Sequence, residues 1–96
     1  MKLTIKEAEL TARALWKEMC EDNRDNVEQY SHIIYNLQKE YGLEQWDVLR
    51  NKRGDVIYTV QYSIKKLFEM KDKFEADGIE CEWTAEFYAD DNWMNQ

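Results

Sequence analysis

The spacing of hydrophobic residues predicts two helices in the first half of the chain. A capping box, Thr4 with Glu7 three residues later, precedes an apolar stripe at helical spacing. A second stripe follows, with Asp25 as its expected N-cap and Gly42 in the place of a C-terminal glycine. The predicted helices span 4–21 and 25–41. We expect them to form a hairpin, and one long helix is the alternative.

A two-residue repeat replaces the helical spacing after these helices, and this repeat is typical of strands. Residues 55–62 carry apolar or aromatic side chains at alternate positions up to Tyr62, and 44–50 shows a weaker pattern with Trp46 and Val48 on one face. The linking Asn51-Lys52-Arg53-Gly54 has the composition of a turn. We therefore expect 44–50 and 55–62 to form a β-hairpin.

A third helix and a third strand complete the predicted elements. Ser63 is the expected N-cap of a helix that ends at Gly78. Residues 79–87 then alternate strictly, which predicts a strand with an apolar and a polar face. The apolar face has Ile79, Cys81, Trp83, Ala85 and Phe87, and the polar face has Glu80, Glu82, Thr84 and Glu86. A helix over 79–87 is the alternative.

The element order α-α-β-β-α-β predicts a single small α+β domain over residues 1–96. The third helix reverses the chain, so the third strand can lie antiparallel beside the first and give a mainly antiparallel three-stranded sheet of order 2-1-3. Strands with one apolar face suit helices packed on one side of the sheet, with the other side open to water. If residues 43–62 and 79–88 were helical, the chain would be an all-α helical bundle.

The charge is distributed unevenly along the chain. The net charge of -7 comes from 13 basic and 20 acidic residues, and residues 74–96 hold seven of the acids and no base. Hydrophobic residues make up 44% of the 96 residues, which is ordinary for a globular domain. The acidic last quarter is therefore the feature that points to a partner rather than to the fold.

The sequence offers no recognisable catalytic or metal-binding motif, so we expect neither an enzyme nor a cofactor. His32 is the only histidine and has no local partner for acid–base work. Cys20 and Cys81 lack the paired spacing of a zinc site. No apolar run resembles a signal peptide or a membrane span, which predicts a soluble cytoplasmic protein with reduced thiols.

We expect the acidic region to bind a protein partner with a basic, nucleic-acid-binding surface. Carboxylates spaced along a strand can take the place of nucleic-acid phosphates in a groove lined by Arg and Lys, and aromatic side chains can anchor such a contact. The candidate partner-binding residues are Glu75, Asp77, Glu80, Glu82, Glu86, Tyr88, Asp90, Asp91 and Trp93. The alternative is that these acids only keep an outer face solvated and discourage edge pairing.

In size, charge and lack of enzymatic motifs the chain is similar to small inhibitors encoded by phages and mobile elements, including anti-CRISPR proteins. Bacteriocin and toxin immunity proteins share this general character. The resemblance implies an inhibitor of a nucleic-acid-handling protein or an immunity protein. Two other possibilities remain open from the residues: an assembly module that self-associates through exposed aromatics or a strand edge, and a nucleic-acid binder that uses Arg50, Lys52 and Arg53.

Overall fold

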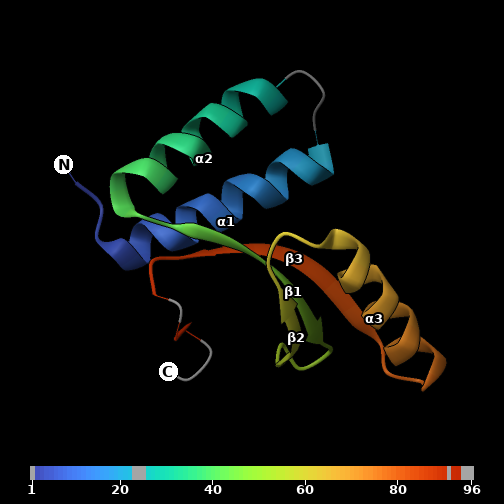
Figure 1. Cartoon of the computed structure of the whole chain (residues 1–96). Coiled ribbons are helices and arrows are strands. Elements are labelled where there is room, and N and C mark those ends of the chain that lie inside the picture. The colour runs from blue at the N-terminus through green and yellow to red at the C-terminus, as the bar shows by residue number, and fades with distance from the viewer. Residues whose placement is uncertain (1, 23–25, 91, 94–96) are drawn as a thin grey trace. The chain divides into compact units, whose positions relative to one another are not determined.

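The structure is a computed structural model that describes residues 2–22, 26–90 and 92–93 (Figure 1). The elements are α1 (Ile5–Asp22), α2 (Val27–Tyr41), β1 (Glu44–Asn51), β2 (Val56–Val60), α3 (Ile64–Ala76) and β3 (Cys81–Tyr88). The strands form an antiparallel sheet of order β2-β1-β3. The α+β class, the element order and the strand order are therefore confirmed.

By its internal contacts the chain divides into two compact units. Unit 1 contains residues 1–45 and 86–96, and unit 2 contains residues 46–85. The strands β1 and β3 each contribute residues to both units. Each unit is described by itself below, and the expectation of a single domain over 1–96 stays a prediction.

Unit 1 is built around a helical hairpin. The capping box at the start of α1 forms as expected: the Thr4 N–H donates to the Glu7 carboxylate at 2.9 Å, and the Glu7 N–H donates to the Thr4 hydroxyl at 3.1 Å. The helices α1 and α2 contact each other, which confirms the hairpin and excludes the single long helix. The core of the unit contains Ala8, Ala12, Ile34, Leu43 and Phe87.

The predicted C-terminal glycine of α2 is confirmed, whereas its N-cap differs from the prediction. Gly42 adopts a left-handed φ of 68°, and its N–H donates to the Gln38 carbonyl, so the expected C-terminal glycine is confirmed. The N-cap is Asn26 rather than Asp25, and the Asn26 side chain makes no capping hydrogen bond. Asp25 lies outside the described residues.

Unit 2 begins with the predicted hairpin of β1 and β2, in which Leu49 lies opposite Tyr58. The turn is closed by the Asn51 side chain, whose Oδ1 accepts hydrogen bonds from the N–H groups of Arg53 and Asp55 at 3.0 Å each. Gly54 adopts a φ of 86°, which a side chain would disfavour. The turn chemistry in the sequence therefore specifies the hairpin.

The core of unit 2 lies between the sheet and α3. Its buried members are Leu49, Leu67 and Cys81, and half-buried apolar side chains from β2, α3 and β3 surround them. α3 places Leu67, Met70 and Phe74 on this core at helical spacing. Ser63 occupies the N-cap position as expected, but its side chain makes no capping hydrogen bond.

Two apolar residues that the alternation assigned to strands lie outside them. β2 ends at Val60, and Tyr62 has a left-handed φ of 62° and is 90% exposed. β3 begins at Cys81, and Ile79 precedes it: its side chain is exposed, and its N–H donates to the Phe74 carbonyl at the end of α3 at 2.9 Å. Periodicity predicted both positions wrongly because backbone turns at the neighbouring helix ends override it.

The face of the sheet that was expected to be exposed to water is buried at one place in β1 and one place in β3. Val48 lies between Asp47 and Leu49 in β1, and all three side chains are buried. Since neighbouring strand residues point to opposite faces, both faces of β1 are covered there. The same holds in β3 for Ala85, Glu86 and Phe87.

Candidate functional site

Two acidic residues of the segment 74–96 form ion pairs with lysines that precede this segment in the sequence. Lys71 Nζ lies 3.0 Å from a Glu75 carboxylate oxygen, and Lys52 Nζ lies 2.8 Å from a Glu80 carboxylate oxygen. The Glu75 carboxylate raises the pKa of Lys71. A segment without bases in the sequence is therefore partly neutralised in the fold.

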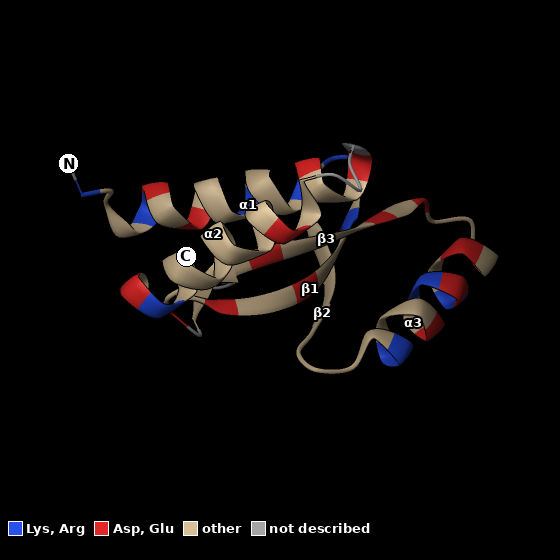
Figure 2. Cartoon of the chain, turned by 90° about the horizontal axis from the view of Figure 1, so that it is seen from above, with Lys and Arg blue, Asp and Glu red and all other residues tan. Residues whose placement is uncertain are grey.

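The negative charge is also distributed differently between the two units than along the chain (Figure 2). Unit 2 contains seven basic and eight acidic residues, a net charge of -1, because β1, the β1–β2 turn and α3 supply its lysines and arginines. Unit 1 contains six basic and twelve acidic residues, a net charge of -6. Most of the net charge of -7 therefore belongs to the unit of the helical hairpin.

Four of the predicted partner-binding residues are exposed and lie close together in the sequence of unit 2, and we call them the acidic segment: Glu75, Asp77, Glu80 and Glu82. It runs from the last turn of α3 to the second residue of β3. Asp77 and Glu82 have no ion-pair partner among the described residues. Ile79, 41% exposed, places an apolar side chain within the same stretch.

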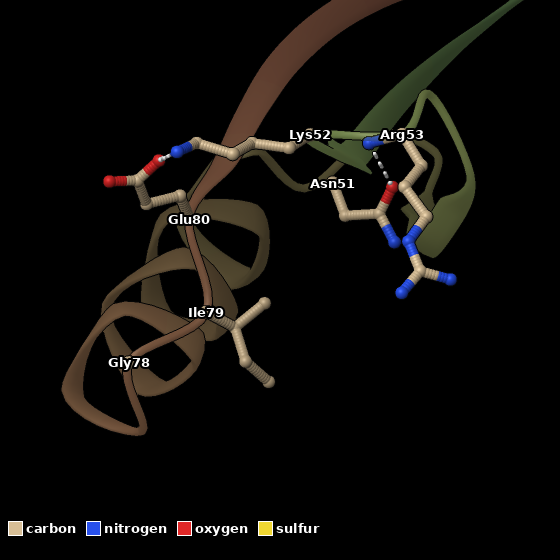
Figure 3. Close-up of a pocket in the computed structure, with 6 residues that line it drawn as sticks. All are labelled: Asn51, Lys52, Arg53, Gly78, Ile79 and Glu80. Carbon is tan, nitrogen blue, oxygen red and sulfur yellow. Dashed lines mark hydrogen bonds and ion pairs between the residues drawn. The ribbon is translucent and has the colours of Figure 1, made fainter.

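The β1–β2 turn lies against the acidic segment and forms an open depression of about 350 Å³ (Figure 3). Asn51, Lys52 and Arg53 line it from the turn, and residues 78–80 line it from the connection between α3 and β3. The Arg53 guanidinium points away from the Glu80 carboxylate, which Lys52 occupies (Figure 3). The depression therefore presents an ion pair, an apolar side chain and an outward-pointing guanidinium.

This ion pair and a contact within the turn also bear on the nucleic-acid-binding alternative. Lys52 is engaged by Glu80, and Arg50 Nη1 donates to the Gly54 carbonyl at 2.6 Å. Two of the three basic side chains proposed to contact nucleic acid therefore have a partner within the protein, and the Lys52–Glu80 pair is exposed. Only Arg53 is exposed without an ion-pair partner among the described residues.

Glu86 does not belong to an exposed face, and its assignment as a surface carboxylate is wrong. Its side chain has no solvent exposure, and its Oε1 accepts a hydrogen bond from the Tyr88 hydroxyl. Arg13 of α1 lies 3.6 Å from the Glu86 Oε2. A buried carboxylate requires such partners, so Glu86 is a member of an internal polar cluster with Arg13 and Tyr88.

The predicted aromatic anchors contact each other instead of projecting separately. The rings of Tyr88 and Trp93 are stacked, with centroids 4.1 Å apart and an interplanar angle of 9°, and both side chains are half-buried. Asp90 is exposed, and its Oδ1 accepts a hydrogen bond from the Asn92 N–H at 2.9 Å. Asp91 lies outside the described residues. These residues belong to unit 1, whereas the acidic segment belongs to unit 2.

The residues considered for catalysis or metal binding lie on three different elements. His32 is exposed on α2, Cys20 is exposed at the end of α1, and Cys81 is buried in the core of unit 2. Burial raises the pKa of the Cys81 thiol, and burial together with Glu21 raises that of Cys20. In the described residues no group of His, Cys, Asp and Glu side chains is arranged to hold a metal ion. No helix there has the length and apolar character needed to cross a membrane.

Two long-range polar contacts had no signal in the sequence. Arg13 and Glu86 are far apart along the chain, and so are Asp47 and Trp83, whose indole N–H donates to the Asp47 carboxylate at 3.2 Å. Glu86 and Asp47 are charged residues within strands, but alternation along a strand does not show which of its faces is covered by other parts of the protein.

Comparison with protein-family models, with curated proteins and with solved structures gives no match.

Proposed function

We propose that this chain is a small acidic binding protein that inhibits a nucleic-acid-handling protein by occupying its basic surface. The observation that carries the proposal is the acidic segment, which presents four exposed carboxylates between Glu75 and Glu82. Inhibitors of this kind are encoded by phages and mobile elements against host defence, and an anti-CRISPR-like role is the form we propose. The site of action would be the cytoplasm, where such targets work.

The contacts inside unit 2 show how the acidic segment accepts basic groups. Glu75 and Glu80 each hold a lysine ammonium group at 3.0 Å or less. The Lys52–Glu80 pair is exposed, with the Lys52 side chain 80% and the Glu80 side chain 71% accessible, so it contributes little to stability and can be exchanged for a partner's Arg or Lys. Asp77 and Glu82 are available without displacing an internal partner among the described residues.

Binding rather than catalysis accounts for these features. The exposed carboxylates would steer a basic partner toward the protein and would make association faster at low salt than at high salt. Ile79 lies between Asp77 and Glu80 and would provide an apolar contact within the charged surface. The nucleic acid and this chain would then compete for the same groove of the target.

The test is a pull-down from the host cytosol with the tagged chain and two triple variants. The first variant, Asp77→Asn, Glu80→Gln and Glu82→Gln, neutralises three of the four carboxylates of the acidic segment. The control variant, Glu18→Gln, Glu21→Gln and Glu28→Gln, removes the same charge from exposed positions on α1 and α2. Glu86 is left unchanged because its side chain is buried.

We expect the wild type and the control to retain a basic nucleic-acid-binding protein that the first variant does not retain. Added double-stranded DNA or RNA should release that protein, because inhibitor and nucleic acid occupy one surface. Equal retention by all three chains, or retention unaffected by nucleic acid, would show that the acidic segment is only a solvated surface.

A further inference from the structure

The Lys52–Glu80 ion pair places a cation of this chain on one carboxylate of the acidic segment. Lys52 Nζ lies 2.8 Å from Glu80 Oε2, at the open depression between the β1–β2 turn and residues 78–80 (Figure 3). The pair joins two separate connections, because Lys52 belongs to the turn and Glu80 directly precedes β3. A partner's cation that takes this carboxylate oxygen must therefore displace the Lys52 ammonium group.

The two internal lysines of the acidic segment differ in how easily they leave their carboxylates. The Lys71 side chain is only 26% exposed, and its partner Glu75 lies one turn further along α3, where the helix holds the two side chains side by side. The Lys52 side chain is 80% exposed, so its ammonium group is well hydrated when it leaves Glu80. Lys52 is therefore the lysine that a partner can displace.

The turn that carries Lys52 does not depend on this ion pair. The Asn51 side chain accepts hydrogen bonds from the N–H groups of Arg53 and Asp55. The Asn51 N–H in turn donates to the Asp55 carbonyl at 3.0 Å. None of these hydrogen bonds involves the Lys52 side chain, so that side chain can leave Glu80 while the hairpin stays folded.

We propose that Lys52 is an internal competitor for Glu80, and that it competes with an arginine side chain of the partner. The Lys52 ammonium group is a point charge and contacts one carboxylate oxygen of Glu80. A guanidinium group can bond both oxygens of a carboxylate at once, so an arginine displaces Lys52 more readily than a lysine does. This inference rests on the proposed inhibitor function and names the chemistry and the regulation of its site.

The strength of the ion pair sets the size of the competition. Exposed ion pairs are weak, and their measured strengths mean that such a pair is closed only about one to five times as often as it is open. The apparent dissociation constant of a ligand is its intrinsic value divided by the fraction of the protein that is open to it. Removing the Lys52 ammonium group should therefore tighten the binding of an arginine about two- to sixfold.

The test measures how the full chain binds a tri-arginine peptide with blocked ends, by NMR titration. Changes in the amide signals of residues 77–82 locate the contact and give the dissociation constant. Lys52→Gln removes the competing ammonium group. Arg53→Gln is the matched control, because it removes the same charge from the next residue of the turn, whose guanidinium points away from Glu80 (Figure 3).

We expect Lys52→Gln to lower the dissociation constant about two- to sixfold, and Arg53→Gln to change it less than about twofold. In chains that also carry Glu80→Gln, the two changes should have equal effects, because the contested carboxylate is gone. Equal effects in chains that keep Glu80 overturn the proposal, since only the net charge then acts. Unchanged amide signals over residues 77–82 also overturn it.

A tri-lysine peptide with blocked ends tests the preference for arginine and should bind the wild type more weakly. Equal binding of the two peptides overturns arginine as the competing group.

The pull-down described above separates this inference from the inhibitor function. If Lys52→Gln tightens peptide binding but the wild type retains no basic protein, the competition is supported and the inhibitor function fails. If the wild type retains a target and Lys52→Gln and Arg53→Gln retain it equally well, the inhibitor function is supported and the competition is overturned.

Discussion

The internal cluster of Glu86, Tyr88 and Arg13 should contribute strongly to the stability of the fold. Replacing Glu86 with Ala removes the charged acceptor of the Tyr88 hydroxyl, and losing a hydrogen bond to a charged group costs about 1.5–3 kcal/mol. Losing the one buried methylene group that Ala lacks costs about 0.8 kcal/mol. The Arg13 side chain is 39% exposed and keeps contact with water, so its loss of a partner adds less than about 1 kcal/mol.

The combined effect of Glu86→Ala is therefore a loss of about 3 kcal/mol in the free energy of unfolding. Glu86→Gln should lose less, about 1–2 kcal/mol, because its amide oxygen still accepts from Tyr88 but the charge assistance is gone. The matched control is Glu82→Ala, an exposed glutamate on the same face of β3, which should change stability by no more than about 0.5 kcal/mol.

Urea unfolding, followed by tryptophan fluorescence and by far-ultraviolet circular dichroism, measures these differences. A cycle with Tyr88→Phe tests whether the contact itself is responsible. The double variant of Glu86→Ala and Tyr88→Phe should lose less stability than the two single losses added together, since each single change removes the same hydrogen bond. If Glu86→Ala and Glu82→Ala unfold at the same urea concentration, the stabilising role of the cluster is refuted.

Two further predictions concern the ends of the helices. The pKa of Glu7 is lowered first by the Thr4 N–H and then by the Thr4 side chain, so its stabilising effect is present above the ordinary value of 4.5 and is lost as the pH falls through the lowered pKa. Urea midpoints measured between neutral and acid pH should fall more steeply for the wild type than for Glu7→Gln, and parallel profiles would contradict this. Gly42→Ala should lose about 1–2 kcal/mol of unfolding free energy, because φ is 68° and the added Cβ meets no atom within 4 Å, so only backbone strain acts. Gly42→Asn should lose less in the same urea assay, and equal losses would show that the left-handed backbone is not the cause.

Local signals in the sequence were sufficient for most of the secondary structure. The capping box of Thr4 and Glu7, the glycine after α2 and the turn at Asn51 each act through hydrogen bonds between residues close in the chain. Their effect does not depend on the rest of the fold. The alternation of residues 79–87 likewise identified β3, although the predicted strand begins two residues before the observed one, which starts at Cys81. The element order then left few possible topologies, and the strand order 2-1-3 was among them.

The surface was where sequence reasoning failed, and Glu86 shows why. Periodicity assigns a residue to a face of a strand, but it does not show whether that face is covered. Only the tertiary structure brings Arg13 beside Glu86 and a lysine beside Glu80, because these partners come from distant segments. By itself the sequence determined the elements, their order and the total charge. The tertiary structure decided which carboxylates remain at the surface, because burial and ion pairing depend on contacts between residues far apart in the chain.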